Sequence, residues 1–142
     1  MGAASPQPPA WLVYGGAPPE PDGVPVSGAA SRTRAGLHET LAGSLALPGW
    51  YGHNWDALAD ALADRLDSGP LTLVVTDAAD LLADEPPAQL GTLLDVLGAV
   101  AAGGHETLRV VLRDDPDRLR ALRDRVAAVL GGRVGAPPPA TG

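Results

Sequence analysis

Residues 54–67 carry leucines and aspartates at a spacing that predicts an amphipathic helix. At about 100° per residue, one stripe of this helix is apolar and consists of Trp55, Leu58, Leu62 and Leu66. A second stripe, on the other side, is acidic and consists of Asp56, Asp60, Asp64 and Asp67. Asn54 is a good N-cap, because its short side chain can accept a hydrogen bond from a free amide of the first turn. The pattern predicts one face in a core and the other toward water or a partner.

The preceding segment carries another apolar stripe, formed by the leucines at 37, 41 and 45. This spacing predicts an amphipathic helix that starts at about residue 33 or 35 and reaches residue 47. Pro48 is expected to end it, because proline lacks an amide donor and clashes with the preceding turn. In the loop that follows, Tyr51 is expected to be buried, and Trp50 is equally compatible with burial and with exposure for binding. Trp55 is expected in the core.

Three runs rich in β-branched and other apolar residues predict strands at residues 11–14, 71–76 and 108–112. The middle run is typical of a strand that is covered on both faces in a parallel sheet. A short helix is predicted over residues 77–83, and a longer one from Pro86 or Pro87 to about Ala102. Strand, helix and strand then form a crossover unit, which is right-handed in nearly all parallel sheets. Residues 24–26 suggest only a short extended piece, so the predicted fold is α/β, with a small three-stranded parallel sheet packed with helices.

Proline, glycine and alanine dominate both ends of the chain, so residues 1–10 and 132–142 are predicted to be disordered tails. Residues 11–113 form the predicted domain. Residues 114–131 add a C-terminal helix, with Pro116 in its first turn. The apolar stripe of this helix is expected to dock on the domain and consists of Leu119, Leu122, Val126 and Leu130. Its arginines, expected to form a solvated face or alternatively to screen the acidic helix, are Arg118, Arg120, Arg123 and Arg125.

The chain of 142 residues has a formal net charge of −7, which is unevenly distributed. Residues 1–104 contain twelve acidic residues and three arginines. Because an acidic chain without lysine repels phosphate backbones, direct nucleic-acid binding is not expected. The absence of cysteine excludes disulfides and cysteine-based metal or redox sites. Without a signal-peptide pattern or an apolar run of ~20 residues, the expected location is the cytoplasm, with no membrane contact.

The acidic stripe opposes helix formation, because each pair of like charges four residues apart destabilises a helix by roughly 0.2 to 0.5 kcal/mol. A face that served only solubility would more naturally alternate Glu with Lys. A short carboxylate has few rotamers to freeze on binding, which suits an interaction surface. The stripe alone nevertheless fits an interaction surface and a solvated face equally well. An exposed acidic face disfavours self-association, so a monomer is expected when the protein is free.

Paired carboxylates also raise the alternative of a metal-dependent enzyme. Asp56 and Asp60 would lie about 5 to 6 Å apart at their Cβ atoms, which a divalent metal could bridge. No histidine or third carboxylate converges on them in the sequence, and no glycine-rich phosphate loop is present. His38 and His105 lack metal-ligand spacing. We therefore expect neither catalysis nor a cofactor or metal.

The irregular run at residues 37–62, LHETLAGSLALPGWYGHNWDALADAL, resembles the barstar family of ribonuclease inhibitors. The downstream order of strand, short helix, helix and strand agrees with that family as well, so the similarity spans roughly residues 34–113. The resemblance implies a cytoplasmic inhibitor or immunity protein that forms a 1:1 complex with a basic secreted ribonuclease or nuclease toxin. It also implies the mechanism, in which the loop and second helix enter the nuclease active site and carboxylates stand in for RNA phosphates.

The resemblance places five residues at the partner, namely Trp50, Gly52, Asn54, Asp56 and Asp60. The predicted partner-binding set also includes His53, from its place in the loop, and Asp64, from its place on the acidic stripe. The chain departs from the family at Ala59, where barstar has a contact tryptophan. It also lacks a clear counterpart of a glutamate from the third helix, because Gly98 and Ala99 lie near that position. The alternative is therefore a barstar-like domain repurposed to bind another basic protein.

Overall fold

The computed structural model describes residues 9–15, 23–48, 51–104 and 106–134, with the side chains of residues 131–134 left out. In this part of the chain the sheet has four parallel strands in the order β1-β4-β3-β2. The strands are β1 (Leu12–Tyr14), β2 (Val24–Ser27), β3 (Leu71–Thr76) and β4 (Leu108–Leu112). The prediction of three strands is wrong by one, since the short extended piece near residue 24 is a full member of the sheet.

The sequence pattern of strand β2 is weak, because its apolar run is interrupted by Pro25 and Ser27. It lies at an edge of the sheet and pairs only with β3, where Val26 faces Val75 in the register. Proline is tolerated at such an edge because no partner strand needs its missing amide. The outward carbonyl of Pro25 accepts a hydrogen bond of 2.8 Å from the Ser44 hydroxyl. A hydroxyl thus occupies the position that a further strand would take.

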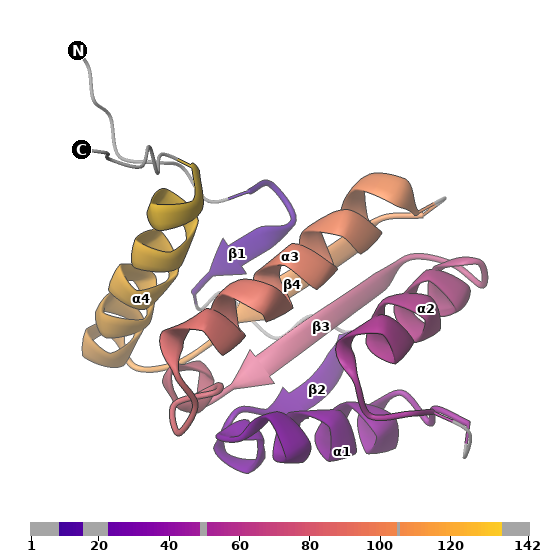
Figure 1. The fold of residues 1–142 in the computed structure, drawn as a ribbon, viewed down its shortest axis with the longest axis horizontal. Coiled ribbons are helices and arrows are strands. Elements are labelled where there is room, and N and C mark those ends of the chain that lie inside the picture. Colours follow the sequence, from indigo (N-terminus) through magenta and orange to yellow (C-terminus); the bar gives the residue numbers. More distant parts are fainter. Residues whose placement is uncertain (1–8, 16–22, 49–50, 105, 135–142) are drawn as a thin grey trace.

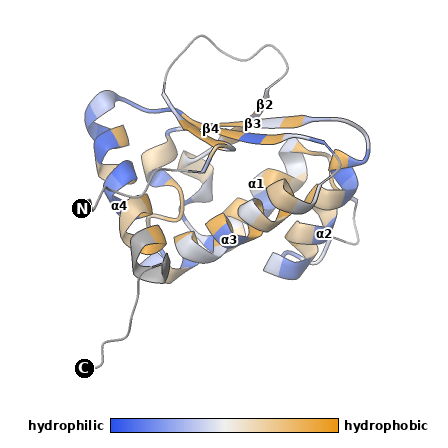
Figure 2. Ribbon diagram, turned by 90° about the horizontal axis from the view of Figure 1, so that it is seen from above, coloured by the Kyte–Doolittle hydropathy of each residue, from blue (hydrophilic) through white to orange (hydrophobic). Residues whose placement is uncertain are grey.

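Four α-helices connect and follow the strands in the described residues (Figure 1): α1 (Arg34–Ser44), α2 (Trp55–Leu66), α3 (Pro87–Gly103) and α4 (Pro116–Val134). Two short 3₁₀ turns, η1 (Ala29–Ser31) and η2 (Ala78–Asp80), complete the order. Figure 2 shows the four α-helices on one side of the sheet. The helices thus cover one face, where Leu73 and Val75 of β3 join the core. Val74 alternates to the other face and is also buried, at 8 % exposure, so the cover on both faces that residues 71–76 predict is confirmed at this residue.

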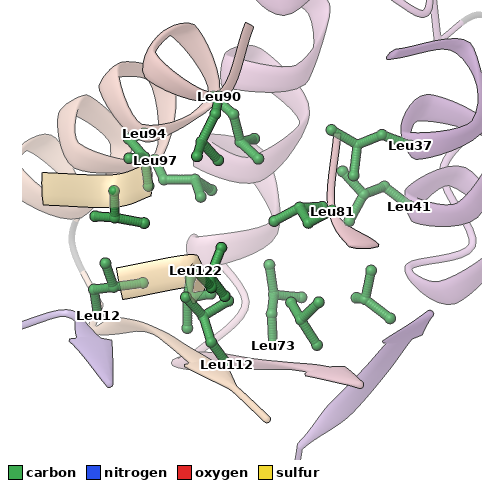
Figure 3. Close-up of a pocket in the computed structure, with 15 residues that line it drawn as sticks. Leu12, Leu37, Leu41, Leu73, Leu81, Leu90, Leu94, Leu97, Leu112 and Leu122 are labelled. Atoms are coloured by element: carbon green, nitrogen blue, oxygen red, sulfur yellow. The ribbon is translucent and has the colours of Figure 1, made fainter. Parts of the chain in front are cut away.

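The core is built mainly from leucine and valine, as a chain without Phe or Ile requires. Leucines from the sheet and the helices converge on one point between these layers (Figure 3). They enclose an apolar cavity of about 30 Å³, lined on opposite sides by side chains such as Leu73 and Leu94. Leu122 and Val126 of α4 also line this cavity and are almost fully buried. The predicted docking of the C-terminal helix is confirmed.

Helix α1 ends earlier than Pro48 predicts. Its last residue is Ser44, and Ala46 then adopts a left-handed conformation with φ of 51°. The amide of Leu47 donates to the carbonyl of Ala42 at 2.9 Å, and the amide of Ala46 donates to that of Gly43 at 3.3 Å. This pair of bonds satisfies carbonyls at the helix end and stops the helix before the proline. Helix α4 continues to Val134, and the tail residues 1–8 and 135–142 lie outside the described residues.

Candidate functional site

Helix α2 presents its polar face from a firmly anchored position. Its leucines at 58, 62 and 66 have 0 % exposure and join the common core. The Asn54 side chain accepts a hydrogen bond of 2.8 Å from the amide of Ala57, so the predicted N-cap is confirmed. Asp56 lies in the first turn, where the positive end of the helix dipole favours a carboxylate. The helix is thereby fixed at its start and along its buried side.

Three carboxylates of the acidic stripe are exposed and have no ion pair within the described residues. Asp56, Asp60 and Asp64 are all exposed, and none of them has an ion pair or a side-chain hydrogen bond within the described residues. The one base on this helix, Arg65, is half-buried and donates to the carbonyl of Gly69 at 3.2 Å. The carboxylates are therefore neither covered by other elements nor neutralised by the arginine on their own helix.

Two arginines of α4 bind groups of their own fold and do not screen α2. Arg118 pairs with Asp80 and with Asp114, each at 3.0 Å. Arg125 donates to the carbonyls of Ala79 and Leu81 at 3.1 and 3.0 Å. Helices α4 and α2 lie at opposite ends of the molecule (Figure 1). The screening alternative is therefore wrong, and a purely solvated basic face is wrong for Arg118 and Arg125.

Arg123 and Arg120 make weaker contacts. The guanidinium of Arg123 lies 4.7 Å from the centroid of the Tyr14 ring, a cation–π contact that reaches back to β1. Arg120 pairs with Asp117 at 3.2 Å, and both side chains are largely exposed. These two arginines thus remain at the surface, as predicted, but Arg123 helps hold α4 beside the sheet.

The loop before α2 packs on the buried side chains of Tyr51 and His38. Tyr51 is 5 % exposed, which confirms the prediction of burial, and its hydroxyl forms a hydrogen bond with Nδ1 of His38. Gly52 and His53 are exposed, and His53 adopts a left-handed backbone conformation with φ of 52°. The Trp55 ring lies 5.2 Å from the His38 ring between centroids and is half-buried at the edge of the core. Trp50 lies outside the described residues.

His38 is a buried polar residue that was not among the predicted site residues. Its side chain is 1 % exposed, and Nε2 has no hydrogen-bond partner in the described structure. Burial lowers the pKa of His38, and the nearby His53 and Arg34 lower it further. Burial also raises the pKa of Tyr51 to about 12, so its hydroxyl stays protonated at neutral pH. A neutral imidazole and a neutral phenol therefore support the loop. The sequence indicates that His38 is buried, because position 38 falls on the edge of the leucine stripe of α1.

The positions that depart from the family pattern are small residues in different surroundings. Ala59 is half-buried and packs against the core, next to the exposed Asp60. At Gly98, an added Cβ would meet the Trp11 ring at 3.6 Å. This is an ordinary van der Waals distance, so packing does not explain the glycine there. Ala99 is exposed.

The described residues also bear on metal binding and on membrane crossing. No group of three or more His, Cys, Asp or Glu side chains there is arranged to hold a metal ion. None of the described helices combines the length and apolarity needed to cross a membrane.

Comparison with protein families gives one match. The family model described as Barstar (barnase inhibitor) matches residues 23–124. This range begins just before β2, includes the loop and α2, and ends within α4. No curated protein matches the chain. Because the match covers well over half of the chain, the resemblance drawn from residues 37–62 is confirmed, and the chain belongs to the barstar family of barnase inhibitors.

Proposed function

We propose that the chain is a ribonuclease inhibitor or immunity protein that binds a basic nuclease one to one and blocks its active site. The partner-facing surface consists of Trp50, Gly52, His53, Asn54, Asp56, Asp60 and Asp64. Residues 11–113 with the docked helix at 114–131 form the inhibitory unit, and the site of action is the cytoplasm of the cell that makes the nuclease. No cofactor takes part.

The observation that carries this proposal is the exposed, unpaired acidic face of α2. Nuclease active sites hold phosphate oxygens with arginine and other cationic side chains, and a carboxylate accepts the same bidentate hydrogen bonds. Asp56, Asp60 and Asp64 are short and mounted on a helix whose other side is buried. Little conformational entropy is therefore lost when they bind. Their unscreened charge also speeds the encounter with a basic protein.

Membership in an inhibitor family supports the same reading, since the family is described by barnase inhibition. The second candidate, a repurposed domain that binds another basic protein, is favoured by Ala59, where the family pattern has a contact tryptophan. Both candidates use the same surface. They differ in whether the target is a nuclease.

The test is inhibition of RNA hydrolysis by barnase, with the purified chain in stoichiometric and excess amounts. We expect inhibition by the wild type. We expect Asp60→Asn to weaken it by about 10- to 100-fold, because a hydrogen bond to a charged group contributes about 1.5–3 kcal/mol. The matched control is Asp124→Asn, which removes the same charge from an exposed position on α4.

The outcomes separate the two candidates. Inhibition that Asp60→Asn weakens and Asp124→Asn leaves intact supports the nuclease inhibitor. Equal inhibition by all three proteins removes Asp60 from the surface. If the wild type leaves barnase active but slows other basic nucleases, the proposal holds with a different target. If it inhibits no basic nuclease and still binds basic proteins in a salt-dependent way, the repurposed domain is correct.

A further inference from the structure

A cluster of four rings joins helix α1 to the loop before α2. His38 comes from α1, Tyr51 and His53 come from the loop, and Trp55 opens α2. The ring of His38 lies 5.7 Å from that of Tyr51 and 6.1 Å from that of His53, with the two imidazoles stacked at 23°. The ring of His53 lies 5.0 Å from that of Tyr51. The exposed loop therefore packs on a buried histidine.

The surroundings of His38 suit only the neutral imidazole. The groups that act on its charge are His53 from the loop and Arg34 from its own helix, and both oppose a positive charge. Tyr51 supplies an uncharged hydroxyl, and Trp55 supplies a ring. No carboxylate is paired with His38 in the described residues. A buried charge without a counter-charge or full hydrogen bonding is strongly disfavoured.

The second ring nitrogen, Nε2, also disfavours protonation of His38. Nε2 of His38 is buried and has no partner in the described structure. In the imidazolium form both ring nitrogens carry a proton, so Nε2–H would be a charged donor without an acceptor. The neutral ring leaves one uncharged atom unpaired, which costs less. Protonation must therefore be accompanied by movement that brings water or another acceptor to Nε2.

We propose that His38 is a positioning residue for the partner-facing loop: while its imidazole is neutral it holds Tyr51, and through Tyr51 the turn at residues 51–54 and the start of α2, and protonation in acid releases that turn. The term partner-facing rests on the function proposed above. The positioning itself is a property of the free protein. It makes the acidic helix a surface that is fully formed at neutral pH and loosened in acid.

The direction of the pH effect follows from the depressed pKa of folded His38. Above the ordinary histidine pKa of about 6.5, the ring is neutral in both folded and released forms, and the loop is held. As the pH falls below that value, the released form takes up the proton first, so the held form loses stability until the pH passes the folded pKa. Above about pH 6.5 the loop should therefore be insensitive to pH.

The experiment is an NMR titration of the free protein from pH 8 to pH 5, following the ring signals of His38 together with amide protection factors. The informative amides are those of Tyr51 and Ala57, which donate to Pro48 and to the Asn54 side chain at 3.0 and 2.8 Å. The control amide is that of Val110, which donates to Trp11 in the sheet. We expect the protection of Tyr51 and Ala57 to fall by about tenfold for each pH unit below about 6.5, until the pH passes the folded pKa of His38. Val110 should stay protected.

Three variants make the assignment specific. His38→Gln, which is neutral at every pH, should abolish the pH dependence of the loop amides. His53→Gln removes a neighbouring imidazole that opposes protonation of His38, so the midpoint of the loop transition should move to higher pH. Tyr51→Phe keeps the ring and removes the hydroxyl, and it should loosen the loop at all pH values. It also serves if His38→Gln does not fold.

Several results would overturn the proposal. They are a His38 titration without change at Tyr51 and Ala57, an unchanged pH dependence in His38→Gln, an unmoved midpoint in His53→Gln, and a loss of protection that includes Val110 to the same extent. Since no partner is present, these results are independent of inhibition. A chain that fails to inhibit barnase can still show the coupling, and one that inhibits barnase can still lack it.

Discussion

Helices α2 and α4 are both highly charged, but they use their charges in opposite ways. The exposed carboxylates of α2 at positions 56, 60 and 64 have no ion pair within the described residues. On α4, Arg118 and Arg125 bind groups of η2 and the segment after β4. The comparison shows that charge density alone does not identify an interaction surface. The decisive property is whether the charges already have partners in the same chain.

The two helices also differ in how their charges affect the stability of the fold. On α2, neighbouring like charges oppose the helix and are tolerated because buried leucines hold it. On α4, the ion pairs form a network that begins at Arg32, which pairs with Asp80 at 2.7 Å and Asp84 at 2.9 Å. Asp80 is shared by Arg32 and Arg118, so this network joins the end of η1, η2 and α4. The charges of α4 are therefore largely used within the fold, whereas the carboxylates of α2 at positions 56, 60 and 64 are left without ion pairs in the described residues.

The largest expected effect comes from removing the anchor of either helix. Leu62 and Leu122 both have 0 % exposure, and Leu→Ala at either position should lower the free energy of unfolding by about 2–5 kcal/mol. Denaturant unfolding measures this loss. Leu62→Ala should also weaken barnase inhibition by the molecules that remain folded, whereas Leu122→Ala should leave it intact. Equal loss of inhibition in both variants would mean that the two helices are not functionally distinct.

A smaller effect is expected at Asp114, which supports the α4 side. Its side chain is 5 % exposed; burial alone would raise its pKa, but the amides of Ala79 and Asp115 and the guanidinium of Arg118 together lower it. A carboxyl whose folded pKa is lowered adds stability above its ordinary pKa of 3.8, and this stability is lost as the pH falls through the folded pKa. Asp114→Asn should therefore destabilise the protein by about 1–3 kcal/mol at pH 7.

The measurement for Asp114→Asn is denaturant unfolding at pH 7 and at several values below pH 4. The difference between the variant and the wild type should shrink in acid, because the wild-type carboxyl is then protonated as well. Inhibition of barnase at pH 7 should not change. A constant difference at all pH values would show that the carboxylate charge contributes nothing to the fold.

The smallest expected effect is a gain in stability on α2. Asp64→Lys removes the like-charge pair with Asp60 and creates an opposite-charge pair four residues apart, with the acid on the N-terminal side. Each such pair contributes about 0.2–0.5 kcal/mol to a helix. We expect slightly higher stability together with weaker and slower binding to barnase, measured by thermal unfolding and stopped-flow association. A destabilised variant would show that Asp64 has a structural partner after all.

Much of the fold could be predicted from spacing alone. The strands at residues 71–76 and 108–112, the cap at Asn54 and the docked stripe of α4 all depend on local pattern, and the structure has them where they were expected. Strand β2 was missed because its pairing with β3 bridges almost fifty residues, while its own four residues include a proline. The end of α1 depended on Ala46 in a left-handed conformation, which alanine rarely adopts and no pattern signals.

The candidate site was likewise predictable from the sequence only in part. Exposure of Asp56, Asp60 and Asp64 followed from their helical spacing, since the opposite stripe had to be buried. The roles of Arg118 and His38 did not follow, because their partners at Asp80 and Tyr51 lie far away in the sequence. Long-range pairs of this kind become visible only when the fold brings the elements together.

The outer border of β2 has a consequence for how the protein behaves when crowded. At Pro25 this border has no amide to offer, and its carbonyl is already bound by Ser44; the next outward carbonyl, of Ser27, is bound by the hydroxyl of Ser31 at 2.7 Å. A β-strand of another molecule would find few open bonding groups there. Two serines and a proline thus guard this edge of the sheet against pairing with a strand of another molecule.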